Sequence, residues 1–408
     1  MFGFDWKNKK NKAQSENKEG LITKQEDDFS MVGTPEFEKS DKPENEKTEK
    51  EKLLDQIAEI SKQGYAFLKE NDTANATIEF KRILTLDEHN NYALVGLGDA
   101  ARKEHKCEDA IKYYTECLTH HPDNNYALFG LADCHKFLKQ YNRAIEVWEK
   151  YLKFDDTNIT VLTRIGDSYR KIRNFDNAKR LYQRVLELSE ENSYALIGLG
   201  HLYYDFKKYR EALGYWQKVL EISGDHVDIR ILTSIGNCYR KIKQFDKGVP
   251  FFQDALKRDE DNFYALFGLA DCYRGLNQQS QSIQYWNRIL EQDPNNKVIL
   301  TRVGDAYRNK KEYKKAEECY QRALDIAYDS YAMLGLAILK KRQGMYEEAI
   351  TSLLQLIQAD RKNYRVYLEL ADCYIQTNRK SDAINILKTF KQFGIRNQAI
   401  NELYDSLL

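Results

Sequence analysis

The chain has 408 residues, and its 63 Lys and Arg residues equal its 63 Asp and Glu residues in number. This balance gives no overall positive field that would draw the chain onto nucleic acid or anionic lipid. The 5 Pro and 20 Gly residues are too few for the many tight turns of an all-β fold, so the composition favours long helices. No apolar run approaches the ~20 residues that a bilayer crossing requires, so we expect no membrane insertion.

Residues 1–50 are predicted to form a disordered charged tail, because Lys, Glu, Asp, Asn and Ser dominate and the apolar residues follow no period. Phe2, Phe4 and Trp6 precede a basic stretch, which is either a short docking motif or an incidental cluster. Residues 1–12 lack the features of a secretory signal, and the 7 scattered Cys residues are most simply read as free thiols in a reducing compartment. We therefore expect a cytoplasmic location.

From about residue 51 the sequence repeats itself with a period of 34 residues. A Gly or Ala marks each of ten units, with one interval of 36 and one of 33, at Gly64, Gly98, Ala132, Gly166, Gly200, Gly236, Ala270, Gly304, Ala337 and Ala371. A second small residue follows twelve positions later, and in eight units an aromatic residue comes four positions after that. Small residues allow helices to approach closely, and the large residues fill the space opposite.

Each unit contains two amphipathic segments of about 13 residues with a short polar turn between them, which predicts a helical hairpin. One hairpin cannot bury both of its apolar faces, so neighbouring hairpins must stack. We predict an all-α fold with ten stacked hairpins over residues 51–397, followed by a capping helix over residues 398–408.

This pattern resembles the tetratricopeptide repeat family, which carries Leu-Gly and a Tyr on the first helix, Ala and an aromatic residue on the second, and Pro in the linker. The resemblance covers residues 57 to about 397, and one stretch that carries it contains Leu199, Gly200, Tyr203, Ala212 and Trp216. Leu replaces the family's early Trp, and the linker Pro survives only at Pro122 and Pro294. The resemblance implies a right-handed α-solenoid whose first helices line a concave groove, commonly used to hold an extended peptide or a partner helix.

Given that geometry, three columns of residues on the first helices are predicted to face the groove. An acidic or amide residue follows most of the small residues, with His201 as an exception, a basic residue comes three positions later in most of these units, with Tyr204 as an exception, and a Tyr recurs near the helix start. An acid and a base at this spacing contribute only about 0.2–0.5 kcal/mol per pair. Tyr and Arg are frequent hot spots of protein interfaces, so we interpret the columns as a binding surface. The alternative is that these residues merely cap or pack against neighbouring repeats.

Two residues before the small column, Gly and Arg alternate in part, giving Gly130, Arg164, Gly198, Ser234, Gly268, Arg302 and Gly335. Gly within a helix costs about 0.5–1 kcal/mol relative to Ala. Each Gly is therefore predicted to clear space on the groove floor for a long side chain of the next unit or for a ligand backbone, and the alternative is an inherited two-repeat duplication without use. The predicted groove-binding residues are Tyr92, Asp99, Arg102, Tyr126, Asp133, Lys136, Arg164, Asp167, Arg170, Tyr194, Asn237, Arg240, Tyr264, Asp271, Arg274, Arg302, Asp305 and Arg308.

The interval of 36 adds two residues in the linker 223–228, and the same unit has Gly248 at a predicted helix contact and Pro250 inside its second helix. Pro removes a backbone N–H and clashes with the preceding turn. We predict a kink or a shortened helix at residues 247–251, with a bend between the fifth and sixth units. The alternative is a local accommodation without functional motion.

Enzyme signals are weak. The stretch 96–101 matches G-x-G-x-x-A, but it lies within a predicted helix and no strand precedes it. The 7 His residues show no metal-ligand spacing. Four Cys residues follow the small column by two positions and are predicted to be buried and structural: Cys134, Cys238, Cys272 and Cys373. We predict no catalytic residue, no metal and no cofactor.

The leading functional hypothesis is a non-enzymatic cytoplasmic scaffold or adaptor that binds an extended peptide or protein partner in the concave groove. The alternative is a regulatory sensor whose superhelix responds to a small ligand or a signalling peptide. Alternating acids and bases argue against nucleic-acid binding. The sequence leaves the partner's identity and the oligomeric state open.

Overall fold

The computed structural model describes residues 48–408, which form helices and turns without a strand. The predicted tail, residues 1–50, therefore lies almost wholly outside the described residues. The chain divides into two compact units, residues 1–190 and 191–408.

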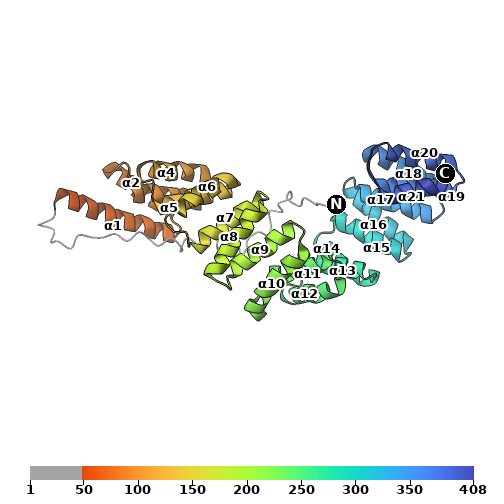
Figure 1. Ribbon diagram of the computed structural model, residues 1–408, viewed down its shortest axis with the longest axis horizontal. Helices are drawn as coiled ribbons and strands as arrows, with labels where there is room; N and C mark the ends of the chain where they lie inside the picture. The colour runs from red at the N-terminus through yellow and green to blue at the C-terminus, as the bar shows by residue number, and fades with distance from the viewer. Residues whose placement is uncertain (1–47) are drawn as a thin grey trace. The chain divides into compact units, whose positions relative to one another are not determined.

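The first unit contains four antiparallel helix pairs, each of which is one repeat (Figure 1). We call the odd-numbered helix of each pair the first helix and the even-numbered one the second helix. The first helices are α1 (Glu49–Lys69), α3 (Asn91–Lys103), α5 (Asn125–Phe137) and α7 (Ile159–Lys171). The second helices are α2 (Thr73–Leu86), α4 (Cys107–His120), α6 (Tyr141–Tyr151) and α8 (Phe175–Leu188).

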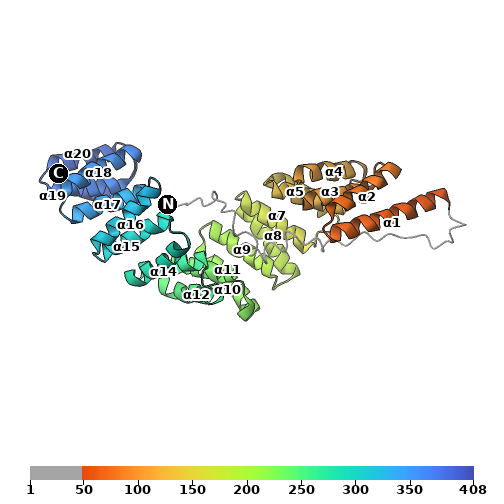
Figure 2. The ribbon, with the colours of Figure 1, turned by 180° about the vertical axis from the view of Figure 1, so that it is seen from behind.

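The second unit continues the same alternation over six pairs, seen from both sides in Figures 1 and 2. The first helices are α9 (Ser193–Asp205), α11 (Ile229–Lys241), α13 (Phe263–Gly275), α15 (Lys297–Asn309), α17 (Ser330–Arg342) and α19 (Tyr364–Gln376). The second helices are α10 (Tyr209–Ser223), α12 (Phe245–Arg258), α14 (Gln279–Gln292), α16 (Tyr313–Ile326), α18 (Tyr346–Ala359) and α20 (Lys380–Lys391). The last helix, α21 (Gln398–Leu407), packs on α20 and α19.

Asn residues define where most first helices begin. In each of these repeats the Asn at the N-cap accepts a hydrogen bond from the backbone N–H three residues later, at Asn90, Asn124, Asn158, Asn192, Asn262 and Asn296. Such a cap satisfies a helix donor that would otherwise lack a partner, and it typically stabilises the helix by about 1 kcal/mol. The same element therefore starts in register in repeat after repeat.

The turn inside each hairpin also repeats its geometry. One residue between the two helices adopts a left-handed conformation, with φ between 59° and 64° at His105, Lys139, Arg173, Lys207, Lys243, Asn277 and Lys311. This conformation costs a non-Gly residue about 1–2 kcal/mol, so packing of the two helices has to offset it. The predicted short polar turns, including 173–175, are confirmed.

Four aromatic residues of the second-helix column lie between two first helices: Phe80, Tyr114, Phe252 and Tyr320. The ring of Tyr114 in α4 is fully buried, and a Cβ added at Gly98 in α3 or at Gly130 in α5 would overlap it. The same arrangement recurs at Phe252. The core of each unit therefore continues from one repeat to the next through these rings.

The predicted groove-floor role of the Gly column is wrong at Gly130, Gly268 and Gly335. Their backbones make room for an aromatic ring of the preceding repeat, and the rings concerned are Tyr114, Phe252 and Tyr320. Each ring comes from a second helix, and not from a long side chain of the next unit. The cost of each Gly is offset by burial of the protein's own aromatic residue.

Several neighbouring first helices contact one another directly: α3 contacts α1 and α5, α11 contacts α13, and α17 contacts α15 and α19. Among the helices of residues 48–408, no two consecutive second helices make contacts of that extent. Helices on the inner side of a curved stack lie closer together than those on the outer side, so each unit curves towards its first helices. We call the surface that the first helices form in each unit the first-helix face.

The irregular linker lies inside the second unit, where Gly224–His226 forms a short 3₁₀ turn between α10 and α11. The predicted shortening of the following second helix is wrong, because α12 runs unbroken from Phe245 to Arg258 with Pro250 inside it. Pro250 is exposed, so its ring does not disturb the core. The predicted close contact at Gly248 is confirmed, since an added Cβ would lie 3.1 Å from the carbonyl oxygen of Gly236.

The 7 Cys residues are buried and free, as predicted for the four of the small-column series. Burial raises the pKa of the Cys238 and Cys272 thiols to about 12 and that of Cys373 to about 11, so these thiols stay protonated. Residues 96–101 lie within α3, as predicted. Within residues 48–408, no helix combines the length and the apolar character that crossing a membrane would need.

Candidate functional site

The predicted site residues lie on one side of each first helix because of their spacing. In α13, Tyr264, Phe267, Asp271 and Arg274 occupy positions i, i+3, i+7 and i+10, which fall on one face of a helix. The same positions of α5 hold Tyr126, Phe129, Asp133 and Lys136. A short period therefore places a hydroxyl, a ring, a carboxylate and a cation in a row along the helix.

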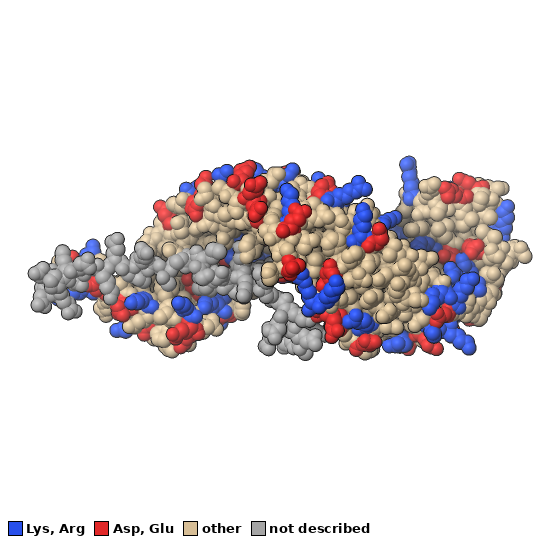
Figure 3. All heavy atoms as spheres, turned by 90° about the horizontal axis from the view of Figure 1, so that it is seen from below, with Lys and Arg blue, Asp and Glu red and all other residues tan. Residues whose placement is uncertain are grey.

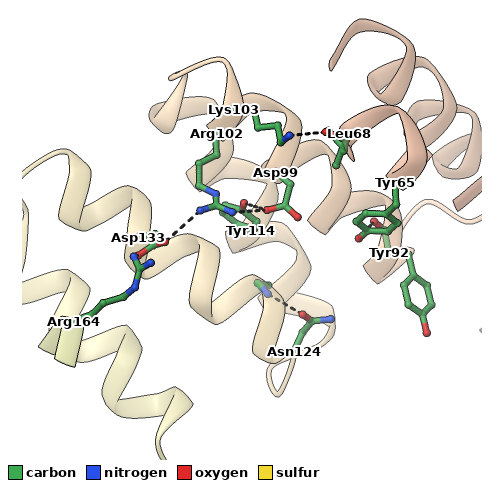
Figure 4. Close-up of polar contacts among 11 residues, drawn as sticks. Tyr65, Leu68, Tyr92, Asp99, Arg102, Lys103, Tyr114, Asn124, Asp133 and Arg164 are labelled. Atoms are coloured by element: carbon green, nitrogen blue, oxygen red, sulfur yellow. Dashed lines mark hydrogen bonds and ion pairs between the residues drawn. The ribbon is translucent and has the colours of Figure 1, made fainter. Parts of the chain in front are cut away.

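In the first unit, the buried Asp133 of α5 joins three first helices (Figure 4). Arg102 of α3 donates from Nη1 to Asp133 Oδ2 at 3.3 Å, and Arg164 of α7 donates from Nη1 to Asp133 Oδ1. The Arg164 guanidinium also stacks over the ring of Phe129, 5.0 Å from its centroid. The carboxylate thus holds an arginine from the repeat on each side.

The other end of this network is a carboxylate that faces a tyrosine hydroxyl. Tyr114 of α4 donates to Asp99 Oδ1 at 2.6 Å, and Arg102 contacts the same oxygen at 3.3 Å. Burial raises the pKa of the Asp99 carboxyl, while the positive charge of Arg102 and the Tyr114 hydrogen bond oppose that rise. Removing the hydroxyl would leave this half-buried acid with fewer donors.

The second unit contains the same cluster around Asp271 of α13. Arg240 of α11 donates to Asp271 Oδ2 at 2.7 Å, and Arg302 of α15 donates to Oδ1 at 2.8 Å. Arg274, from α13 itself, lies 3.1 Å from Oδ1. The Arg302 guanidinium lies 4.8 Å from the centroid of the Phe267 ring, as Arg164 does over Phe129.

The residue directly after the Gly or Ala of the small column is matched to the aromatic residue of the second helix in repeats where that aromatic residue is Tyr114, Tyr182, Tyr320 or Phe252. Where that residue is Tyr, the acid accepts its hydroxyl hydrogen, as Asp167 does from Tyr182 at 2.6 Å and Asp305 from Tyr320 at 2.7 Å. Asn237 stands where the second-helix residue is Phe252, which has no hydroxyl to donate. Asn237 Oδ1 instead accepts from Arg240 Nε and Nη2, at 3.2 and 2.9 Å.

At the far end of the second unit the balance of charge reverses. Lys341 of α17 contacts two acids of α19, Glu369 and Asp372, the latter at 2.7 Å. Glu369 occupies the column position that Arg164 and Arg302 hold elsewhere. One cation here faces two carboxylates.

The Tyr column near the helix starts is the most accessible part of the predicted site in the second unit. Tyr264 is 70% exposed, and Tyr194 and Tyr331 are also exposed. In the first unit Tyr92 and Tyr126 are half-buried, and the carbonyl oxygen of Tyr92 accepts from the Tyr65 hydroxyl. Arg230, which holds this column position in α11, pairs with the helix-capping Asp228 at 2.6 Å.

Four of the predicted acid–base pairs within one helix are present. An acid and a base three residues apart contact each other at 3.3 Å for Asp99 and Arg102, 4.0 Å for Asp167 and Arg170, 3.1 Å for Asp271 and Arg274, and 2.9 Å for Asp305 and Arg308. The contacts of these arginines with acids of neighbouring repeats agree with the alternative stated for the columns, packing against neighbouring repeats. The roles of Lys341, Glu369 and the Tyr hydroxyls were not predicted. The spacing of 31 residues from a base to the acid of the next repeat is the signal that could have revealed the contacts between repeats.

One open cavity of about 420 Å³ lies in the first unit, between α2, α3 and α4. It includes none of the predicted site residues. Two of its acids are already paired with lysines, Glu104 with Lys106 at 2.7 Å and Asp109 with Lys112 at 2.8 Å. We therefore place the candidate site on the first-helix face and not in this cavity. Lys and Arg are interspersed with Asp and Glu over the surface seen in Figure 3.

Sequence profiles described as tetratricopeptide repeat match residues 101–161, 163–226, 229–262, 264–296, 298–330 and 341–391. No curated protein is significantly similar to the chain.

Similar solved structures include a tetratricopeptide repeat protein from Parabacteroides merdae, with 17% identity over 60% of this chain and 95% of that one (TM-score 0.48). YrrB, described as a TPR protein with an unusual peptide-binding site, has 22% identity over 46% of this chain and 97% of its own (TM-score 0.41). Yeast Tom70 has 12% identity over 86% and 96% (TM-score 0.44).

Proposed function

Because the chain belongs to the tetratricopeptide repeat family, we propose that it is a non-enzymatic cytoplasmic scaffold or adaptor that binds an extended segment of a partner protein along its first-helix face. Repeats of this family form protein-interaction scaffolds in general. The finer assignment, to a particular face and to an extended segment, rests on the residues that this face carries.

The observation that carries the proposal is the row on α13. Tyr264 is 70% exposed and stands on the same helix side as Phe267, Asp271 and Arg274. The buried carboxylate of Asp271 holds the arginines in place, so little side-chain entropy is lost when a partner meets them. An exposed tyrosine beside oriented guanidinium groups is the usual composition of an interface hot spot.

The mixture of charge supports a protein partner. Each cluster of arginines surrounds a carboxylate, and acids alternate with bases along the first helices. A nucleic acid would need a row of cations without such acids, because its phosphates dominate the affinity.

The proposal is tested by site-specific cross-linking in cells. A photoreactive amino acid replaces Tyr264 on the first-helix face or, as the control, Lys257, which is exposed on the second helix α12. We expect partner adducts from position 264 and none from position 257. The double variant Tyr264→Ser and Tyr331→Ser should then weaken binding of the captured partner by about tenfold or more, because truncated hot spots cost about 2 kcal/mol. Adducts confined to position 257, with full binding by the double variant, would contradict the proposal.

Extension of the irregular unit around Asp225 to Pro250 would serve the change of shape that the sensor alternative requires. Since α12 keeps its full length and α10 packs on α11, the structure adds no support for a change of shape at this place. That alternative stays a prediction.

A further inference from the structure

The two arginine clusters are equivalent in position but differ in charge. In the first unit, Arg102 and Arg164 stand with two acids, Asp99 and Asp133. In the second unit, Arg240, Arg274 and Arg302 stand with one acid, because Asn237 replaces the counterpart of Asp99. Three cations around one carboxylate leave the second cluster with a net positive charge, whereas the two arginines and two acids of the first cluster balance.

The surplus in the second cluster cannot be neutralised by the acid beside it. Asp271 is buried and already contacts all three arginines. The neighbouring Asp305 contacts Arg308 at 2.9 Å and accepts the Tyr320 hydroxyl hydrogen. Burial lowers the pKa of Arg302, Asp271 opposes this, and Arg274 and Arg240 lower it further, as expected where cations crowd together.

The second cluster is also the more accessible of the two. The Arg302 side chain is 25% exposed and that of Arg274 is 48% exposed, whereas Arg164, the counterpart of Arg302, is 12% exposed. Arg302 uses only Nη1 in its hydrogen bond to Asp271, and within the described residues its Nε and Nη2 have no acceptor. The Phe267 ring beneath it fixes the plane of the guanidinium.

We propose, on the basis of the function proposed above, that Arg274 and Arg302 form a subsite for a carboxylate side chain, so that the partner segment presents an Asp or Glu residue at α13 and α15. The planar fork of a guanidinium matches the two oxygens of a carboxylate.

The far end of the same unit supports this placement. Around Lys341 two carboxylates face one cation, so this part of the first-helix face repels an acidic residue. The sign of the charge therefore directs the acid of the partner towards α13 and α15, and charge mismatch opposes a shifted register.

The test uses the full chain and two fluorescein-labelled peptides. Both have Gly-Ser flanks, one with a central Trp-Glu-Glu and the other with Trp-Gln-Gln, and binding is followed by fluorescence anisotropy at low ionic strength. We expect the Glu peptide to bind about tenfold more tightly than the Gln peptide, and added salt should reduce that preference.

Three variants locate the preference. Arg302→Gln should reduce the preference for the Glu peptide to about twofold or less. Asn237→Asp restores the second acid while keeping every arginine, and it should also reduce the preference. Arg322→Gln removes the same charge from an exposed position on α16 and should leave it unchanged. Far-UV circular dichroism and melting curves establish that each variant is folded.

The outcomes separate this inference from the proposed function. The carboxylate subsite would be overturned if both peptides bound equally, or if neither peptide bound. It would also be overturned if the preference for the Glu peptide were unchanged in Arg302→Gln and Asn237→Asp. If inorganic phosphate displaced the Glu peptide at concentrations similar to those of the peptide itself, the assignment of the subsite to a carboxylate would be overturned. The proposed function fails only in the cross-linking experiment, which needs no acidic peptide.

Discussion

The substitution Gly268→Ala tests why Gly recurs within the first helices. Gly268 lies in α13, and a Cβ built on it would stand 2.8 Å from Cδ1 of Phe252 and still closer to Cε1 and Cζ. The ring cannot retreat, because on its other side a Cβ at Gly236 would also lie 2.8 Å from Cζ. Phe252 is fully buried, so no solvent-filled space can accept it.

Overpacking of this kind costs about 1–3 kcal/mol, and the severity of the overlap favours the upper end. Ala is better than Gly in a helix by about 1 kcal/mol, so the net loss should be about 2 kcal/mol. Gly214 in α10 provides the matched control, because its added Cβ would have no neighbour within 4 Å. Gly214→Ala should therefore stabilise the protein by about 0.5–1 kcal/mol.

The assay is equilibrium urea unfolding followed by far-UV circular dichroism, with transitions compared between variants because repeat proteins can depart from two-state behaviour. Adding Phe252→Leu to Gly268→Ala should recover part of the loss, since the smaller side chain makes room for the methyl group. If Gly268→Ala were as stable as the wild type, the ring would not lie between two glycines and the packing argument would be refuted. A variant of normal stability that had lost partner binding would instead favour a ligand-facing role for Gly268.

Two further predictions concern single side chains. Tyr114→Phe should destabilise the protein by about 1.5–3 kcal/mol, because Asp99 loses a hydrogen bond of 2.6 Å. Adding Asp99→Asn should recover part of this loss by reproducing the Phe252 and Asn237 pair of the second unit, and strictly additive effects in a double-mutant cycle measured by urea unfolding would contradict the coupling. Pro250→Ala should raise the melting temperature, with a gain of about 1–3 kcal/mol, because Pro250 is exposed inside a complete helix and its replacement restores a backbone N–H. A fall in the melting temperature would show that the ring contributes packing.

The helical hairpins, their number and their family could be predicted from the sequence because they depend on short spacings. The small residues recur every 34 positions, and an Asn at the N-cap or a polar turn acts within three or four residues of itself. The acid–base pairs within one helix could be predicted for the same reason, since helix geometry alone brings Asp271 and Arg274 together.

The contacts between repeats depended on how one hairpin packs on the next, and only the tertiary structure decided them. Gly268 contacts the Phe252 ring of the preceding second helix, and Arg302 contacts Asp271 of another first helix. The helical period relates residues three or four positions apart, so it does not predict which residues of different helices meet. Pro250 shows the same limit, because the packing of α12 outweighed the local tendency of Pro to break a helix. Local periodicity determined which residues share a helix face, and the close approach of neighbouring helices determined which of them are buried, paired or left accessible to a partner.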